Sequence, residues 1–263
     1  MYFKNKIITS TNWLGMWTLF SKETLRFLKV FYQTVLAPIV TNILFLTIFL
    51  IVIDRDRIII GGIGYTEFLV PGLIMMAILQ NAFMNTSSSI MISKIQGNII
   101  DILLPPLSNL ELTIALSLGG VARGMVVGLA SIVVFYFFID MKISNIFYII
   151  FFAFSGSLTL SLLGIAAGIW SDKFDHMAGL TNFIITPLTF LSGSFYSIYK
   201  LPDILQFIAQ YNPFFYFIDG FRKGFIGYSD ANVMTGIVVC LFLNIILFFF
   251  IYKMFQTGYK LRT

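Results

Sequence analysis

The sequence predicts an all-α integral membrane protein with six transmembrane helices, and three observations lead to this fold class. First, 58% of the 263 residues are hydrophobic and only 11% are charged, whereas an ordinary globular domain has roughly a quarter charged residues. Second, six apolar runs have lengths near the roughly 20 residues that a spanning helix needs. Third, Lys and Arg cluster beside these runs, where they set membrane orientation, so the net charge of +5 does not indicate a nucleic acid partner.

Residues 13–31 predict an amphipathic helix that lies at the membrane surface. Apolar and charged side chains recur there at three- and four-residue spacing. The apolar set is Trp13, Met16, Trp17, Phe20, Phe27, Leu28 and Phe31, and the charged set is Lys22, Glu23, Arg26 and Lys29. The preceding residues carry Lys4 and Lys6 but no uninterrupted apolar core or small-residue cleavage site, so we do not expect a cleaved signal peptide.

Six apolar runs follow, which are residues 35–53, 68–91, 112–139, 146–170, 178–194 and 233–252. The shortest would form a helix of about 26 Å at 1.5 Å per residue, which is enough to cross a thin bilayer. Six spans place both termini on one side. The loops on that side hold more Lys and Arg, which predicts that both termini are cytoplasmic. No internal repeat or long linker divides residues 1–263, so one membrane domain is expected.

The segment between the second and third runs, residues 94–104, predicts a short cytoplasmic surface helix that ends before Pro105 and Pro106. Ile99, Ile102 and Leu103 would share one apolar face. A plain loop whose prolines only stop a helix fits the periodicity equally well.

Arg123 lies near the middle of the third run, among Gly119, Gly120, Gly124 and Gly128. An arginine at that depth is costly unless it faces protein, water or a counter-charge, and small residues allow another helix to approach. We expect a structural ion pair with Glu67 or Glu111 in preference to direct substrate contact.

Other polar residues offer little catalytic chemistry. Pro71 and Gly72 lie early in the second run and predict a kinked, tightly packed helix entry. Asp172, Asp175 and His176 are expected to form a solvated cytoplasmic turn. A single Cys240 and a single histidine cannot form an internal disulfide or a multi-histidine metal site. The sequence has no G-x-x-x-x-G-K-[ST] motif, so ATP hydrolysis would have to come from a partner.

The stretch LPDILQFIAQYNPFFYFIDGFRKG (201–224) is apolar but too interrupted to span. Two prolines divide it into halves of about ten residues each. It is either an ordinary loop or a pair of short amphipathic helices at one membrane face.

Four stretches together resemble a known family: EFLVPGLIMM (67–76), IIDILLPPLSNLE (99–111), LSGSFYSI (191–198) and LPDILQFIAQYNPFFYFIDGFRKGFIG (201–227). In order, spacing and span layout the chain resembles the permease subunits of ABC-2 type exporters over nearly its whole length.

The resemblance implies two sets of site residues. A coupling helix at 94–104 would contact an ATPase subunit through Lys94, Gly97, Ile99, Asp101, Ile102, Leu103, Leu104, Pro105 and Pro106, with Ile99, Ile102 and Leu103 as apolar anchors. Two external half-helices at 199–227 would dip into the outer leaflet, with Tyr199, Pro202, Asn212, Pro213, Asp219 and Arg222 as their marked residues. Their charges would sit among headgroups, and the aromatic side chains at 214–217 among acyl chains.

The resemblance also implies partners and a function. The chain would be the permease of an exporter in a bacterial inner membrane, paired with a second permease subunit and two ABC ATPase subunits. It would bind no cofactor or metal itself, because ATP and Mg would sit on the ATPases. The substrate would be amphipathic, lipid-linked, a glycan or drug-like. The alternatives are an ion-gradient-driven transporter or channel, which usually needs acidic or histidine side chains within spans, and an intramembrane enzyme, which needs a catalytic cluster.

Overall fold

The computed structural model describes residues 11–53, 63–139 and 141–261, and helices make up most of these residues. The helices in chain order are α1 (Trp13–Leu28), η1 (Tyr32–Leu36), α2 (Ala37–Ile53), α3 (Tyr65–Ile95), α4 (Ile99–Leu103), α5 (Asn109–Tyr136), α6 (Ile146–Trp170), α7 (Phe174–Leu180), η2 (Thr181–Ile185), α8 (Thr186–Leu191), η3 (Ile198–Lys200), α9 (Asp203–Tyr211), α10 (Pro213–Ile226) and α11 (Val233–Thr257). The predicted all-α membrane architecture is therefore confirmed.

Five helical segments of the described residues are long and apolar enough to cross a membrane. They are Tyr32–Val52, Tyr65–Ile95, Asn109–Tyr136, Ile146–Trp170 and Val233–Thr257. Six such segments were expected. In the apolar run 178–194, residues 178–191 are helical but are divided among α7, η2 and α8.

Both π-helical turns precede a proline. The turn η1 ends at Leu36, two residues before Pro38, and η2 ends at Ile185, two residues before Pro187. Proline has no N–H to donate to the carbonyl four residues earlier, and its ring crowds that carbonyl. A wider turn accommodates this clash without ending the helix. The two prolines therefore account for the irregular first and fifth apolar runs.

The helix α3 forms the centre of the bundle, because 83% of its apolar window is buried and it packs against α5, α6 and α10. Glycines allow these close contacts. A Cβ on Gly72 would lie 2.2 Å from the Ser194 carbonyl oxygen, and one on Gly164 would lie 2.2 Å from Thr86 Oγ1. Pro71 remains inside α3 and is buried. The tight packing predicted for this helix entry is confirmed, and the kink at Pro71 stays a prediction.

The helices α2 and α11 lie at the periphery, and only 22% of each apolar window is buried. Exposed apolar residues on them include Leu44, Ile48 and Ile51 of α2 and Phe242, Ile245 and Phe249 of α11. Such broad apolar faces are suited to lipid or to another membrane chain.

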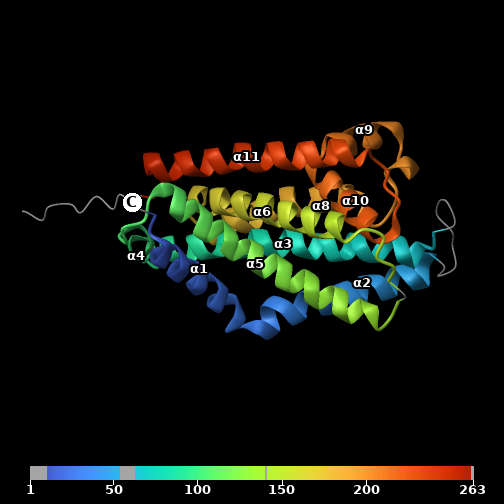
Figure 1. Ribbon diagram of the computed structural model, residues 1–263, viewed down its shortest axis with the longest axis horizontal. Helices are drawn as coiled ribbons and strands as arrows, with labels where there is room; N and C mark the ends of the chain where they lie inside the picture. The colour runs from blue at the N-terminus through green and yellow to red at the C-terminus, as the bar shows by residue number, and fades with distance from the viewer. Residues whose placement is uncertain (1–10, 54–62, 140, 262–263) are drawn as a thin grey trace, which may run out of the picture.

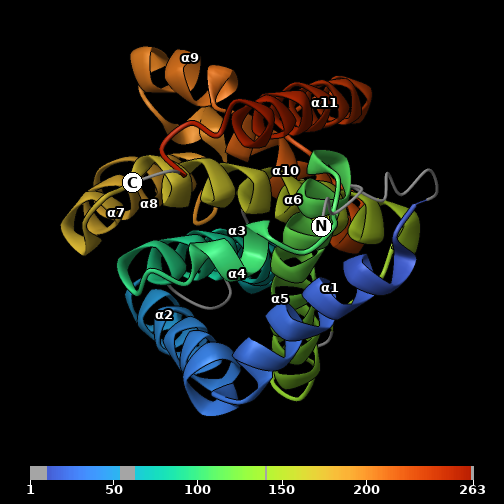
Figure 2. The same ribbon diagram turned by 90° about the vertical axis from the view of Figure 1, so that its left-hand side faces the viewer.

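The short elements gather at opposite ends of the bundle (Figure 1). The helices α1 and α4 and the C-terminal end of α11 lie at one end, and α9 lies at the other. Figure 2, which looks onto the first end, shows α1 lying obliquely across α5. The predicted surface helix begins at Trp13 as expected but ends at Leu28, since residues 29–30 form a turn.

Candidate functional site

The segment that connects α3 and α5 is a compact turn with one short helix. Gly97 has φ +74°, a left-handed conformation that favours glycine, and it follows the end of α3. The helix α4 then occupies Ile99–Leu103, and Pro105 and Pro106 follow it. The predicted short helix is therefore present, within narrower limits than 94–104.

The inner face of α4 belongs to the protein's own core. Ile99 and Ile102 are 7% and 3% exposed and pack in one apolar cluster with Leu19 of α1 and Leu112 of α5. The prediction that these two isoleucines are anchors for a partner is therefore wrong, because α1 and α5 cover that face of α4.

The apolar side chains of this segment that face outward are not Ile99 and Ile102. Ile100 is 56% exposed, Leu103 37% and Leu104 75%. Together with exposed Pro105 and Pro106 they form an apolar surface at the tip of the segment, which we call the tip surface. Of the expected anchors, only Leu103 lies on it.

Lys94, at the end of α3, contacts the end of α6 and the residues that follow it. Its Nζ donates hydrogen bonds to the carbonyl oxygens of Ile169 (2.7 Å) and Ser171 (2.8 Å) and to Asp172 Oδ1 (3.3 Å). Lys260 Nζ in turn donates to Asp172 Oδ2 (2.8 Å) and to the Trp170 carbonyl oxygen (3.0 Å). Asp172 thus joins the ends of α3 and α6 to the C-terminal segment, an arrangement we call the Asp172 clamp.

The turn at residues 172–176 is exposed, as expected, and the clamp adds ion pairs of Asp172 to it. The hydrogen bond from Lys260 is the main cause that lowers the pKa of Asp172, and Lys94 adds to it. The same contact raises the pKa of Lys260. Lys260 has φ 52°, a conformation that is uncommon for a residue with a side chain. Asp175 and His176 are exposed, as expected.

Arg123 is buried, but its partner is not the one expected. Its Nη2 donates to Asn81 Oδ1 of α3 at 2.9 Å. Glu111 instead accepts from the Asn12 N–H (2.6 Å) and the Ser108 N–H (2.7 Å), and Glu67 pairs with Lys142 at 3.9 Å. The expected ion pair of Arg123 with Glu67 or Glu111 is therefore wrong. Neither acid reaches Arg123 because each is held at an end of its helix.

A polar network that the sequence reasoning missed joins α1 to α3. Arg26 Nη2 donates to the Asn85 carbonyl oxygen (2.6 Å) and to Asn85 Oδ1 (3.0 Å). Glu23, only 1% exposed, pairs with Arg26 at 3.2 Å and accepts from Ser89 Oγ at 2.8 Å. The four-residue spacing of Asn81, Asn85 and Ser89 was the available signal, because it places all three on one face of α3.

At the opposite end, residues 199–227 form the expected pair of helices, α9 and α10, which meet at Asn212. The Asn212 side chain accepts from the Phe214 N–H (3.1 Å) and donates to the Leu188 carbonyl oxygen (2.7 Å). It therefore caps α10 and ties it to α8. Pro202 occupies the N-cap position of α9, and Pro213 is the first residue of α10.

Two charges of α10, Asp219 and Arg222, are inside the protein and not at its surface. Arg222 is fully buried, donates to the carbonyl oxygens of Gly193 (2.5 Å) and Phe68 (3.2 Å), and lies 3.7 Å from the Phe68 ring centroid. Asp219 accepts from the backbone N–H groups of Asp230 (2.8 Å) and Ala231 (2.9 Å). The prediction that these charges lie among headgroups is wrong, because α10 packs against α3 and α6.

The aromatic residues beside these charges are also enclosed. Phe214, Phe215 and Phe217 are at most 3% exposed, so protein surrounds them where acyl chains were expected. Tyr199, just before α9, donates from its hydroxyl to the Asp230 carbonyl oxygen at 2.9 Å. The helix α10 is thus a packed part of the bundle, whereas α9 exposes Ile204, Phe207 and Tyr211.

Comparison with known proteins shows the family of the chain. Residues 15–226 match the family described as ABC-2 type transporter. The chain belongs to the ABC-2 type transporter family. This permease is 32% identical over 251 residues to the inner membrane transport permease YadH of Escherichia coli K12, covering 95% of its own chain and 98% of YadH. Over 87 residues it is 31% identical to nodulation protein J of Rhizobium leguminosarum bv. viciae, covering 33% and 34% of the two chains.

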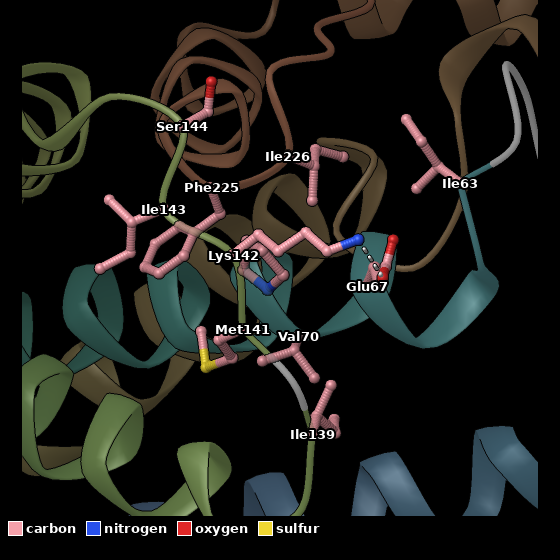
Figure 3. A pocket seen from close by; sticks show the side chains of 11 residues that line it. Ile63, Glu67, Val70, Ile139, Met141, Lys142, Ile143, Ser144, Phe225 and Ile226 are labelled. Carbon is pink, nitrogen blue, oxygen red and sulfur yellow. Dashed lines mark ion pairs between the residues drawn. The ribbon is translucent and has the colours of Figure 1, made fainter.

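Two cavities of the permease lie near these elements. A groove of about 870 Å³ runs from the C-terminal ends of α6 and α11 toward the junction of α8 with α10, and apolar side chains line almost all of it. A smaller pocket of about 410 Å³ lies beside the first turns of α3 and contains Glu67 and Lys142 (Figure 3).

Proposed function

We propose that this chain is the permease subunit of an ATP-driven exporter and that a separate ABC ATPase subunit supplies the ATP and Mg. The family match carries this proposal, and the exposed apolar tip surface supports it. A surface that is apolar, small and outside the spans is suited to docking in a partner's groove. The permease would have no ATPase site of its own.

We further infer that residues 1–263 form one membrane domain with six spans and both termini in the cytoplasm. The segment α7–η2–α8 would be the fifth span, since a π turn lets a helix continue past a proline. The helix α1 would lie at the inner membrane surface, with exposed Trp13 and Trp17 among the headgroups. The helices α9 and α10 would enter the outer leaflet without crossing it. Similarity to YadH favours the bacterial inner membrane.

Two copies of the permease and two ATPases would form the exporter. The exposed apolar faces of α2 and α11 are available for contact with a second copy and with lipid. The long apolar groove beside α6 and α11 favours an amphipathic substrate, whether lipid-linked, glycan-bearing or drug-like, because its walls offer apolar contact over much of the bundle's length.

The proposal is tested by substitutions on the two faces of α4. Leu104→Asp places an unpaired charge in the proposed contact, which by order of magnitude costs several kcal/mol and weakens ATPase docking about a hundredfold. Ile102→Asp charges the permease's own core and is expected to prevent normal folding. For each variant, the measurement is whether the ATPase subunit copurifies with the permease. Only variants whose permease elutes as a folded species are compared.

The matched control is Leu110→Asp, an exposed apolar residue outside the tip surface. We expect it to retain the ATPase. If Leu104→Asp kept its ATPase and normal export, the tip surface would not be the docking site. If no ATPase copurified even with the unaltered permease, the exporter assignment itself would fail.

A further inference from the structure

We infer that the pocket beside the first turns of α3 binds a zwitterionic phospholipid headgroup of the phosphoethanolamine type. In this arrangement Lys142 holds the phosphate, Glu67 holds the ammonium group, and the apolar walls hold the start of the acyl chains. The inference rests on the proposed orientation, in which this end of the bundle faces outward, and it concerns a bound lipid distinct from the exported substrate.

The pocket is built by three separated parts of the chain. Its volume is about 410 Å³, and its walls come from the start of α3, the connection between α5 and α6, and the end of α10. Backbone hydrogen bonds hold the connection in place, since the N–H groups of Ser144 and Asn145 donate to the Gly224 carbonyl oxygen at 2.9 and 2.8 Å. Lys142 is therefore carried by an anchored segment. A cavity of this size accommodates a headgroup and adjoining chain atoms.

The two charged side chains face each other across this space (Figure 3). Lys142 Nζ and Glu67 Oε1 are 3.9 Å apart, well beyond the roughly 2.7–2.9 Å of a charge-assisted hydrogen bond. The Lys142 side chain is 82% exposed and that of Glu67 is 36% exposed. Such a loose, hydrated pair is worth little in itself, so both charges can turn to a ligand at small cost.

The walls around the pair are apolar. Val70, Met141, Ile143, Phe225 and Ile226 line the pocket, and Pro71 closes it one helical turn beyond Glu67. A ligand that matches all of these features has a positive group, a negative group a few ångströms away, and hydrocarbon attached. A purely anionic lipid would place a negative charge next to Glu67. A simple cation would place a positive charge next to Lys142.

The test measures lipids retained by the purified full-length permease, using native mass spectrometry and titration with short-chain phosphatidylethanolamine or phosphatidylglycerol. We expect phosphatidylethanolamine to be preferred about tenfold. Glu67→Gln and Lys142→Gln should each lower its retention about tenfold, because each removes one charge-assisted contact. The double variant Glu67→Lys with Lys142→Glu should restore much of it, since the pair of opposite charges is kept in reversed order.

The matched controls are Asp203→Asn and Lys200→Gln, which remove exposed charges near α9 and outside the pocket. Neither should change lipid retention, and all variants should unfold at the same temperature. The inference would be overturned if phosphatidylglycerol were retained as well as phosphatidylethanolamine and Glu67→Gln changed neither, because Lys142 alone would then bind the lipid. It would also be overturned if neither Glu67→Gln nor Lys142→Gln changed lipid retention, because the two residues would then form only a surface ion pair. Lipid retention is measured without the ATPase, so its outcome is independent of ATPase docking.

Discussion

At the scale of single residues, the buried charges Asp219 and Arg222 of α10 act as structural supports. Arg222 is fully buried and lies 3.9 Å from Asp219. Replacement by methionine would leave Asp219 as an uncompensated buried charge, and breaking such a pair typically costs about 3–5 kcal/mol. We expect Arg222→Met to lower the thermal unfolding midpoint markedly in detergent. Arg222→Lys should be intermediate, because an ammonium group cannot reproduce the guanidinium fork that reaches both carbonyls.

The adjacent residue provides the control for this prediction. Lys223 is only partly buried, and its Nζ contacts Ser229 Oγ at 3.4 Å. Lys223→Met should leave the midpoint almost unchanged. If Arg222→Met and Lys223→Met lowered the unfolding midpoint equally, the burial of Arg222 would not be the cause of the loss of stability.

The Asp172 clamp gives a prediction about pH. The pKa of Asp172 is lowered in the folded protein, so its contribution to stability is present above its ordinary pKa of 3.8 and is lost as pH falls through the lowered value. The pKa of Lys260 is raised, so its contribution is present below its ordinary 10.5 and is lost as pH rises through the raised value. The clamp should therefore be intact from about pH 5 to pH 9.

The measurement is the difference in unfolding midpoint between the unaltered permease and Asp172→Asn. We expect a small difference that stays constant from about pH 5 to pH 9, shrinks in stronger acid, and decreases with added salt. Asp175→Asn is the control, since Asp175 is exposed and has no ion pair among the described residues. A difference that grew on acidification would contradict the assigned ion pairs.

At the scale of elements, the helix α1 is held on the bundle by a buried polar contact. Arg26→Gln would leave Glu23, only 1% exposed, without its cation, at a cost of about 3–5 kcal/mol. That is enough to release a short helix from its docking site. We expect a cysteine placed at buried Leu19 to become much more accessible to a thiol reagent in the Arg26→Gln background.

The control substitution is Lys22→Gln, also on α1, for which the described residues show no ion pair. It should not change labelling at residue 19. If Arg26→Gln left residue 19 protected, apolar contacts of Leu19 and Phe27 would be sufficient to hold α1.

At the scale of the whole molecule, the proposed six-span arrangement would place the two ends of α7–η2–α8 on opposite sides of the membrane. In a background with Cys240→Ala, cysteines at Asn109 and Lys173 should react only with reagent supplied to the cytoplasm. A cysteine at Lys200 should react only from outside. Labelling of Lys173 and Lys200 from the same side would show that the fifth run does not cross.

The sequence by itself determined the fold class, the order of the helices and the family. Those properties depend on composition, on run length and on local breaks such as Pro105 and Asn212–Pro213, all of which act within a few residues. The helix pair at α9 and α10 was predictable for the same reason. Gly72 of α3 and the glycines around Arg123 in α5 also indicated close helix contacts.

Only the tertiary structure decided which side chains meet and which faces remain exposed. Ile99 and Ile102 turned inward because α1 and α5 cover that face of α4. Arg123 contacts Asn81 in place of an acid, and Arg222 lies inside the bundle. In both cases the neighbouring residues belong to helices far away in sequence. Helical periodicity gives a residue's face on its own helix, whereas the packing of other helices decides whether that face meets protein, lipid or water.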